Sequence, residues 1–217
     1  MDSFFKQFCS EEWIDFIEFH KSIVTIPKNN IIFHKNDTVK GLYIIEQGKV
    51  KVFDIENNDK EKIFRLAGDA EILGHRGLGG DWKYPISAKT YEDTKLSFIP
   101  INIFNIITKT NPDFTYQLMM FYAEELRTSE TKINHLQVKN RIARAILYNK
   151  KVFGTTKHDN SILAFTIPRK DYASIANTTY ESVIRTLKEL SDEKTISSNG
   201  KSIQILNPDA LQQLAEQ

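Results

Sequence analysis

The chain has 217 residues, enough for one large domain or two modest domains with hydrophobic cores of their own. Hydrophobic residues make up 41% and charged residues 26%, and the net charge of +1 argues against a strongly basic, non-specific nucleic-acid binder. Cys9 is the only cysteine, so the chain lacks the roughly four thiolates that an iron–sulfur cluster needs. Without a membrane-length apolar run or a signal peptide, we expect a cytoplasmic protein with no membrane partner.

The N-terminal half is predicted to be a short helix followed by short strands. The helix is expected over residues 10–19, with Ser10 as its N-cap and with Trp13, Phe16 and Ile17 facing inward. Strands separated by turns are expected over 23–26, 31–33, 42–45, 50–53, 63–66 and 96–99. Glu46-Gln47-Gly48 predicts a hairpin between two of them, because glycine can adopt a positive φ. This pattern predicts a jelly-roll or double-stranded β-helix barrel, a fold that commonly holds a small ligand.

Two helices are expected next, over residues 101–109 and 112–137, and the second has heptad spacing. Leu118 and Phe121 are expected to pack on the barrel, whereas the far end of the helix extends beyond its reach. A helix packed only on its own barrel is the alternative, but we predict a homodimer. The predicted dimer interface consists of Tyr122, Leu126, Ser129, Ile133 and Leu136.

The C-terminal third contains a predicted helix-turn-helix. A helix over 138–153 and a strand over 162–167 lead to residues 168–190, which parse as two short helices around a tight turn. Thr178 and Thr179 are the two candidate N-caps of the second helix, and a cap at Thr178 would place Glu181 at capping-box spacing. The residues expected to be buried in that helix are Val183, Ile184, Leu187 and Leu190. Asn199-Gly200 predicts a two-residue hairpin, which would be the wing of a winged helix.

The exposed face of the second helix carries base-reading chemistry. Arg185 can donate to O6 and N7 of a guanine, and Glu181 can accept from N4 of a cytosine, one helical turn away. The predicted base-reading set is Tyr180, Glu181, Ser182 and Arg185; an ion pair between Glu181 and Arg185 is the alternative. Residues 138–217 carry a net charge of +4, against −1 for 1–110 and −2 for 111–137, as DNA contacts at this end require. The expected phosphate contacts are Arg169, Thr179, Lys188 and Lys201.

A small barrel, a long helix and a winged helix in this order resemble the Crp/Fnr family of bacterial transcription regulators. The resemblance rests on Gly41–Phe53 in the barrel, on Arg141-Ile142-Ala143, and on the Tyr-Glu-Ser-Val-Ile-Arg stretch at 180–185. It implies an α+β fold with a barrel sensor domain (1–110), a dimerisation helix (111–137) and a winged helix-turn-helix (138–217). It further implies a homodimer that reads a palindrome with TGA-type half-sites, with RNA polymerase as a further partner. Tyr180 stands where the family often has arginine, so the resemblance does not predict which outer bases of each half-site are read.

The sequence departs from the family pattern in the ligand pocket. Cyclic-nucleotide-binding members use a Gly-Glu-Leu stretch for the ribose and an Arg-Ser pair for the cyclic phosphate. The corresponding stretches here are Gly74-His75-Arg76 and Tyr84-Pro85, and Leu126-Arg127 replaces the family's purine-binding Thr-Ser. We therefore expect no cyclic AMP binding and no assigned cofactor, with an effector pocket at His75, Arg76 and Tyr84 whose ligand is open. Arg76 is either a relocated phosphate contact or a solvated surface residue.

Two other functions were weighed against DNA binding. In the first, the barrel senses an unknown small ligand or haem, and the winged helix contacts a protein. His75 is the leading candidate haem ligand among His20, His34, His75, His135 and His158. The charged pair Glu181 and Arg185 argues against an apolar protein interface at that helix. The second is a cupin-like metalloenzyme, but the sequence has no His-x-His. We therefore predict no metal site and no enzymatic activity.

Overall fold

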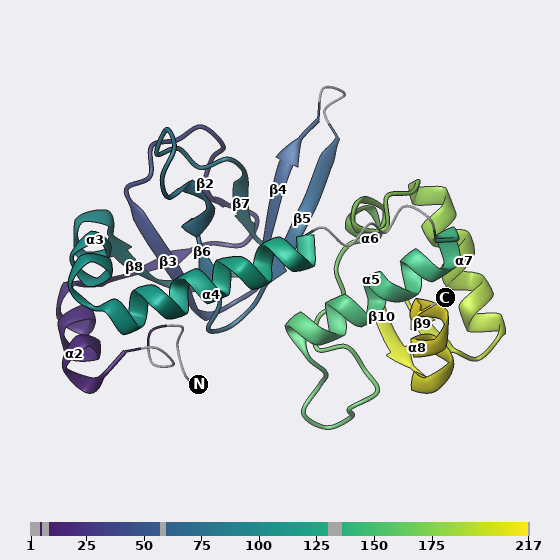
Figure 1. Ribbon diagram of the computed structural model, residues 1–217. Helices are drawn as coiled ribbons and strands as arrows, with labels where there is room; N and C mark the ends of the chain where they lie inside the picture. Colours follow the sequence, from purple (N-terminus) through teal and green to yellow (C-terminus); the bar gives the residue numbers. More distant parts are fainter. Residues whose placement is uncertain (1–4, 6–8, 57–59, 130–135, 217) are drawn as a thin grey trace. The chain divides into compact units, whose positions relative to one another are not determined.

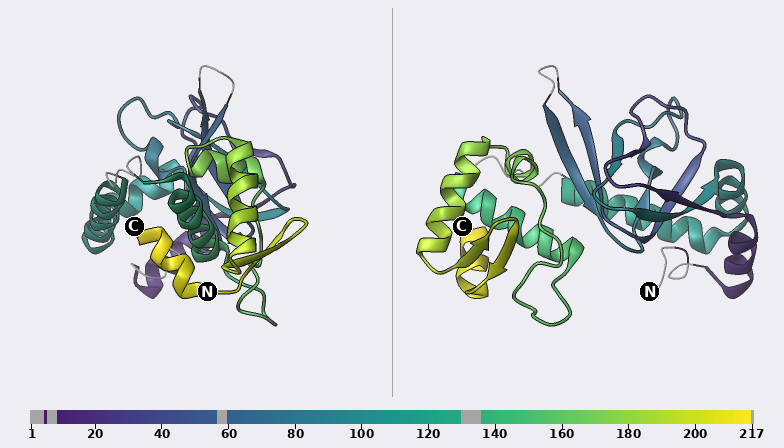
Figure 2. Two further views of the ribbon diagram at one scale, coloured as in Figure 1. Left: turned by 90° about the vertical axis from the view of Figure 1, so that its right-hand side faces the viewer. Right: turned by 180° about the vertical axis from the view of Figure 1, so that it is seen from behind.

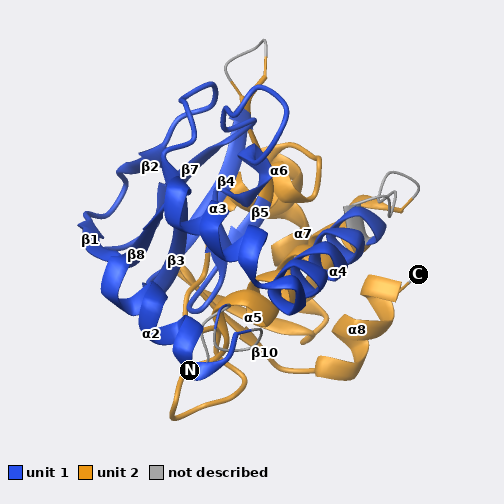
Figure 3. Cartoon of the chain, turned by 60° about the vertical axis from the view of Figure 1, so that its left-hand side comes forward, with its two compact units in different colours: residues 1–54, 65–131 blue, residues 55–64, 132–217 orange. Residues whose placement is uncertain are grey.

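A computed structural model describes Phe5 and residues 9–56, 60–129 and 136–216 (Figure 1). The chain forms two compact units, coloured separately in Figure 3. Unit 1 comprises residues 1–54 and 65–131, and unit 2 comprises residues 55–64 and 132–217. The three-part division at residues 110 and 137 stays a prediction, and each compact unit is described by itself.

Two four-stranded antiparallel sheets make up most of unit 1, although residues 55–64, which include parts of two strands of the second sheet, are assigned to unit 2. The first has the order β1 (Ser22–Ile26), β8 (Thr94–Pro100), β3 (Gly41–Gln47), β6 (Ile72–Leu73). The second has the order β2 (Ile31–Phe33), β7 (Ser87–Thr90), β4 (Val50–Ile55), β5 (Glu61–Ala67). The sequence missed β6 because it has only two residues, and β7 because its Ser-Ala-Lys-Thr stretch has no apolar alternation. Both are strands because neighbouring strands supply their hydrogen bonds.

The predicted hairpin at Glu46-Gln47-Gly48 is wrong. The two strands that flank it belong to different sheets, since β3 pairs with β8 and β6 whereas β4 lies between β7 and β5. Gly48 has a φ of 142°, and its backbone N–H donates to Asp69 Oδ1 at 2.8 Å. A Cβ at this position would lie 2.5 Å from Thr94 Oγ1, so the chain needs glycine to cross between the sheets.

Four helices of unit 1 lie wholly within the described residues: α2 (Glu11–His20), the short 3₁₀ helix η1 (His75–Gly77), α3 (Ile101–Thr110) and α4 (Pro112–Ser129). Helix α4 lies along the barrel in Figure 1 and in Figure 2. Phe114 and Leu118 of α4 share a hydrophobic core with Leu42 and Ile44 of β3, and Phe121 packs against that core. The expected packing of Leu118 and Phe121 on the barrel is confirmed.

The expected continuation of this helix to residue 137 is wrong at its C-terminal end. Leu136 lies in a bend, and Gln137 has a φ of −60° and a ψ of 154°, an extended conformation that cannot continue an α-helix. Gln137 instead stands at the N-cap of the next helix. Ile133 and the side chain of Ser129 lie outside the described residues, so their place in the predicted dimer interface stays a prediction.

Unit 2 contains α5 (Val138–Phe153), α6 (Arg169–Ile175), α7 (Tyr180–Asp192), β9 (Ile196–Asn199), β10 (Ser202–Ile205) and α8 (Pro208–Glu216). Ile142, Ala145 and Ile146 of α5 are buried as expected. Helix α8 was not anticipated from the sequence. In the described part of the chain, no helix combines the length and the apolar character that crossing a membrane requires.

The predicted strand over residues 162–167 is wrong. Only isolated bridges form there, at Ile162 and Leu163. At residues 165–167 the backbone bonds to the side chain of Asn149 and not to a strand. Asn149 Nδ2 donates to the carbonyl of Phe165 at 2.7 Å, and its Oδ1 accepts from the amide of Ile167 at 3.1 Å. A side-chain amide thus replaces a strand partner.

The hydroxyl of Ser174 forms hydrogen bonds with the backbone of β5, and all the residues involved belong to unit 2. Ser174 Oγ of α6 accepts from the amide of Ile63 at 2.8 Å and donates to the carbonyl of Glu61, also at 2.8 Å. Strand β5 is the last strand of its sheet, so among the described residues no further strand lies beside it on that side. One serine therefore satisfies two polar groups at the sheet edge.

Candidate nucleic-acid interface and pocket

Helices α6 and α7 form the predicted helix-turn-helix, joined by a turn in which Asn177 has a left-handed φ of 46°. The N-cap of α7 is Thr179, whose Oγ1 accepts from the amide of Ser182 at 3.2 Å. Of the two candidate caps, the structure selects Thr179, so the capping box that a cap at Thr178 would have formed with Glu181 is absent from α7. The amide of Thr178 bonds to the carbonyl of Ala173, so that residue still belongs to the end of α6.

The buried face of α7 consists of Val183, Thr186, Leu187 and Leu190. Ile184 is 43% exposed, so its expected burial is wrong. It lies about 100° around the helix axis from Val183, which places it at the border of the buried stripe. The stripe fixes the helix on its neighbours α5, α6 and β9 and leaves the opposite face open.

The predicted base-reading side chains lie on this open face. Tyr180 is 52% exposed, Glu181 is exposed and Ser182 is half-buried. The Arg185 side chain is 72% exposed, and its Nε lies 3.8 Å from Glu189 Oε1. In the described structure Arg185 therefore pairs with Glu189 and not with Glu181, and so exposed a pair contributes little stability. Both chemical groups of the predicted reading pair remain accessible.

The predicted phosphate contacts border this face. Arg169 Nη2, at the start of α6, donates to Ser198 Oγ at 3.0 Å and to the carbonyl of Gly200 at 3.2 Å, which links Arg169 to the β9–β10 hairpin. Because Asn199 pairs with Ser202, the hairpin loop consists of Gly200 and Lys201, not of Asn199-Gly200 as expected. Gly200 has a φ of 58°, the left-handed conformation that such a tight loop requires. Lys201 and, on α7, Lys188 are exposed.

Sequence reasoning missed Asn149, which positions helix α6. Asn149 of α5 is fully buried, and besides its bonds to the segment before α6 its Oδ1 accepts from the hydroxyl of Tyr172 at 2.8 Å. Tyr172 is itself fully buried in α6. Burial raises the pKa of the Tyr172 hydroxyl, so it stays a neutral donor. The sequence signal was a lone asparagine on the apolar face of the helix over 138–153.

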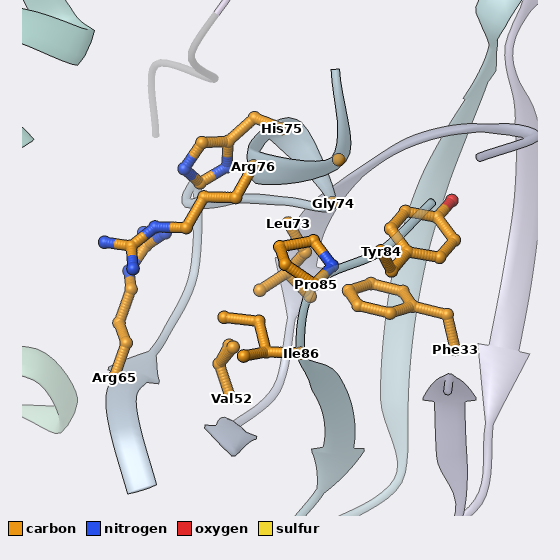
Figure 4. A pocket seen from close by; sticks show the side chains of 11 residues that line it. Phe33, Val52, Arg65, Leu73, Gly74, His75, Arg76, Tyr84, Pro85 and Ile86 are labelled. Carbon is orange, nitrogen blue, oxygen red and sulfur yellow. The ribbon is translucent and has the colours of Figure 1, made fainter. Parts of the chain in front are cut away.

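Unit 1 contains a pocket with about 330 Å³ of empty space, part of it open to solvent (Figure 4). Its apolar wall consists of Phe33, Val52, Leu73, Tyr84, Pro85 and Ile86. The rings of Phe33 and Tyr84 stack with their centroids 4.0 Å apart. The Tyr84 hydroxyl donates to the carbonyl of Gly41 at 2.8 Å, and burial raises its pKa to about 12. Tyr84 is thus a neutral part of the apolar wall.

The charged residues gather at one end of this pocket. His75 and Arg76 of η1 and Arg65 of β5 line it, and Figure 4 shows the two guanidinium groups next to one another. All three side chains face Glu125 of α4. His75 Nε2 lies 2.9 Å from Glu125 Oε2, Arg76 Nε lies 3.4 Å from the same oxygen, and Arg65 Nη1 lies 3.8 Å from Oε1. Arg76 is therefore an ion-paired residue of the pocket rim and not simply a solvated surface residue, while its role as an anion contact stays a prediction.

The pKa values of this cluster follow from its burial and charge. Burial lowers the pKa of His75, despite the opposing effect of Glu125, so the imidazole is neutral near pH 7. A neutral His75 that faces a carboxylate through Nε2 donates its proton there, and its buried Nδ1 has no hydrogen-bond partner. Burial alone would raise the pKa of Glu125, but the His75 hydrogen bond and the charges of Arg76 and Arg65 outweigh it and lower the pKa to about 2.

These residues do not suit a cyclic nucleotide. Of the described residues that line the pocket, none is a carboxylate that could accept the ribose hydroxyls. Tyr84 is a neutral phenol, which brings no positive charge to a cyclic phosphate. The histidines proposed for haem are dispersed: His20 bonds to the carbonyl of Phe16, His34 and His158 are exposed, and His135 lies outside the described residues. Within the described ranges, no three His, Cys, Asp or Glu side chains are placed to hold a metal ion.

Known proteins match both halves of the chain. The family model of the cyclic nucleotide-binding domain matches residues 23–111, and the model of the Crp-like helix-turn-helix domain matches residues 140–214. The chain therefore combines a barrel of the cyclic nucleotide-binding type with a Crp-like DNA-binding domain. It belongs to the Crp/Fnr family of DNA-binding transcription regulators, which are not enzymes.

Individual relatives agree with this assignment. The fumarate and nitrate reduction regulatory protein of Vibrio cholerae is 29% identical over 195 residues, covering 88% of this chain and 77% of that protein. The structure of FixK2 from Bradyrhizobium japonicum matches with a TM-score of 0.79 at 17% identity, over 89% of this chain and 96% of that one. The c-di-GMP-responsive regulator CLP of Xanthomonas campestris matches with a TM-score of 0.75 at 19% identity, over 90% and 99%. At these identities the two structures establish the fold.

Proposed function

We propose that this regulator acts as a homodimer that reads a palindromic DNA site through helix α7 of each subunit. The observation that carries the proposal is the exposure of Glu181 and Arg185, one turn apart on the open face of a helix whose other face is buried. In a helix-turn-helix dimer the two reading helices enter major grooves about 34 Å apart. Tyr180 and Ser182 complete the base-reading set in this proposal.

The proposed phosphate contacts are Arg169, Thr179, Lys188 and Lys201. Arg169 and Lys201 lie at the β9–β10 hairpin, and Thr179 and Lys188 lie on or next to α7, so they could hold the helix in register on the backbone. Such contacts position the protein without reading sequence. A protein that contacts chromosomal DNA in this way would work in the cytoplasm, and RNA polymerase is the proposed protein partner.

The proposed dimer interface is shifted from the one that the heptads indicated. Tyr122 donates its hydroxyl to the carbonyl of His75 at 2.7 Å, which turns it toward the barrel. Leu136 lies in a bend beyond α4. The large apolar side chains of α4 that are exposed are Tyr116, Met119, Met120 and Leu126, between 47% and 66%. Met119 and Met120 lie three and four residues beyond Tyr116, and Leu126 lies seven beyond Met119, so the four share one face of the helix, which suits a second copy of it.

We further propose that DNA binding does not depend on cyclic AMP. The support is the chemistry of the pocket, where an imidazole and a phenol stand at the positions of the family's ribose and phosphate contacts. The regulator would then be either active without a ligand or responsive to a different one.

The test is fluorescence anisotropy of the purified protein, without added nucleotide, on a palindromic duplex with two TGA-type half-sites and on a scrambled duplex. We expect a preference on the order of 10³-fold or more for the palindrome. Equal, weak binding to both duplexes and to a randomised duplex pool would contradict ligand-independent sequence reading. Analytical ultracentrifugation of Met119→Glu and Leu126→Glu, with Glu124→Gln as a control, tests the dimer interface.

A further inference from the structure

The lining of the pocket in unit 1 is apolar at one end and carries two arginines at the other. The apolar end includes the stacked rings of Phe33 and Tyr84. The opposite end carries the guanidinium groups of Arg65 and Arg76 (Figure 4). Arginines beside an apolar cavity suit an anionic group that is attached to an apolar body, because the planar guanidinium binds carboxylates in a defined geometry.

The anion that these arginines now face comes from the protein itself. Glu125 of α4 directs one carboxylate to Arg65, Arg76 and His75, from 49 to 60 residues away along the chain. The Glu125 side chain is only 18% exposed, and it stays ionised because its pKa is lowered to about 2. Glu125 therefore occupies the position in which a ligand carboxylate would lie.

We propose that the pocket binds a small organic monocarboxylic acid with a flat apolar body, in competition with the carboxylate of Glu125. The ring or chain of the acid would lie against Phe33, Tyr84 and Ile86, and its carboxylate would pair with Arg65 and Arg76.

The charge of the cluster selects a single negative charge. Arg65 also pairs with Glu71, at 2.8 Å, and His75 is neutral. When Glu125 leaves, the two arginines and Glu71 together carry a net charge of +1. That charge neutralises the single charge of a carboxylate but only half of the charge of a phosphate monoester.

A second observation supports a ligand at this end of the pocket. His75 is 3% exposed and lines the cavity, and its Nδ1 has no hydrogen-bond partner. Buried polar atoms are rarely left unpaired, so such an atom indicates a missing partner. Nδ1 of a neutral imidazole that donates through Nε2 is an acceptor, which a ligand hydroxyl could satisfy.

The competition has a structural consequence for α4. Glu125 lies three residues beyond Tyr122, and both side chains hold this stretch of α4 to η1. An acid that displaces Glu125 removes one of these attachments close to the exposed residue Leu126. The regulatory meaning of this change rests on the proposed function, whereas ligand binding itself does not.

The test is isothermal titration calorimetry without DNA, with 3-phenylpropionate as the probe and 3-phenylpropanamide and inorganic phosphate as comparison compounds. Glu125→Gln removes the internal competitor, and Glu124→Gln, at the neighbouring position that pairs with Arg127, is the matched control. We expect Glu125→Gln to bind 3-phenylpropionate roughly tenfold or more tightly than the wild type, and Glu124→Gln to match the wild type. The amide and phosphate should bind at least tenfold more weakly than the acid to Glu125→Gln.

Three results would overturn the proposal: equal affinity of both glutamine variants for the acid, equal binding of acid and amide, or equal binding of acid and phosphate. Arg76→Gln provides an independent measurement if Glu125→Gln does not fold. Its side chain is 37% exposed, so the substitution disturbs little packing, and it should weaken binding of the acid to the otherwise native protein. Unchanged binding in Arg76→Gln would also contradict the proposal. Since no DNA is present, these outcomes are separate from those of the DNA-binding test.

Discussion

The reading helix of unit 2 and the pocket of unit 1 use their charged side chains in opposite ways. On α7, Glu181 and Arg185 point outward from a helix that is held by its buried face, so their hydrogen-bonding groups stay available to a partner. In the pocket, Arg65, Arg76 and Glu125 satisfy one another. The surface whose chemistry fits the family therefore keeps its charged groups available, whereas the pocket that departs from the family has its arginines neutralised by Glu125.

The largest expected effect is the loss of DNA affinity when Arg185 on the exposed face of α7 is removed. Arg185→Ala should cost roughly 1–3 kcal/mol of DNA-binding free energy per half-site, or roughly 2–6 kcal/mol for a dimer on a palindrome, because a bidentate contact to guanine is lost. Competition binding to duplexes with each base changed in turn measures this. The preference for one guanine should relax in the variant. Equal losses on cognate and scrambled duplexes would show that Arg185 contacts only the backbone.

The next effect concerns the scaffold below the reading helix. Asn149→Ala should destabilise unit 2 by about 3 kcal/mol, because buried groups of Phe165, Ile167 and Tyr172 lose their hydrogen-bond partner. Urea unfolding followed by circular dichroism measures the loss. Tyr172→Phe is the matched control, since it removes only one of the three bonds and should cost about 1 kcal/mol. Acid binding to the pocket should be unchanged in both variants.

The third effect tests the ion pairs of Glu125 in the pocket through pH. The pKa of Glu125 is lowered from 4.5 to about 2 in the folded protein, so its ion pairs contribute stability above pH 4.5 and lose it as the pH falls toward 2. His75, whose folded pKa is also lowered, acts in the same direction below its ordinary value of 6.5. Thermal unfolding at a series of pH values should show a loss of about 2 kcal/mol in unfolding free energy between pH 4.5 and 2 that is absent in Glu125→Gln, whereas the contribution of His75 remains in that variant. Glu124→Gln should keep the wild-type dependence of stability on pH. If the loss between pH 4.5 and 2 persists in Glu125→Gln, groups other than Glu125 cause it.

The smallest effect is expected at the backbone contacts. Lys188→Ala and Lys201→Ala should weaken binding to all duplexes alike and reduce the slope of log affinity against log salt by about one per phosphate contact removed. Titrations at several salt concentrations measure the slope. Lys109→Ala, an exposed lysine of unit 1, should leave it unchanged. A sequence-dependent loss in Lys188→Ala would instead place that lysine at a base edge.

The sequence predicted the parts that local pattern controls. Val183, Leu187 and Leu190 recur at helical spacing, so the buried stripe of α7 and the exposure of Arg185 followed from periodicity. Strand β7 could not be predicted, because only its pairing with β2 and β4 makes it a strand. The pairing of Glu125 with His75 was also beyond reach, because it depends on how α4 packs on the barrel.

The hydroxyl of Ser174 has a consequence for solubility. An edge strand with unpaired backbone groups is a template for pairing with another chain, and β5 carries the apolar residues Ile63 and Phe64 at such an edge. While α6 is folded, Ser174 occupies the amide of Ile63 and the carbonyl of Glu61. Partial unfolding of α6 uncovers this edge, so variants that loosen the helix are expected to aggregate as well as to lose affinity for DNA.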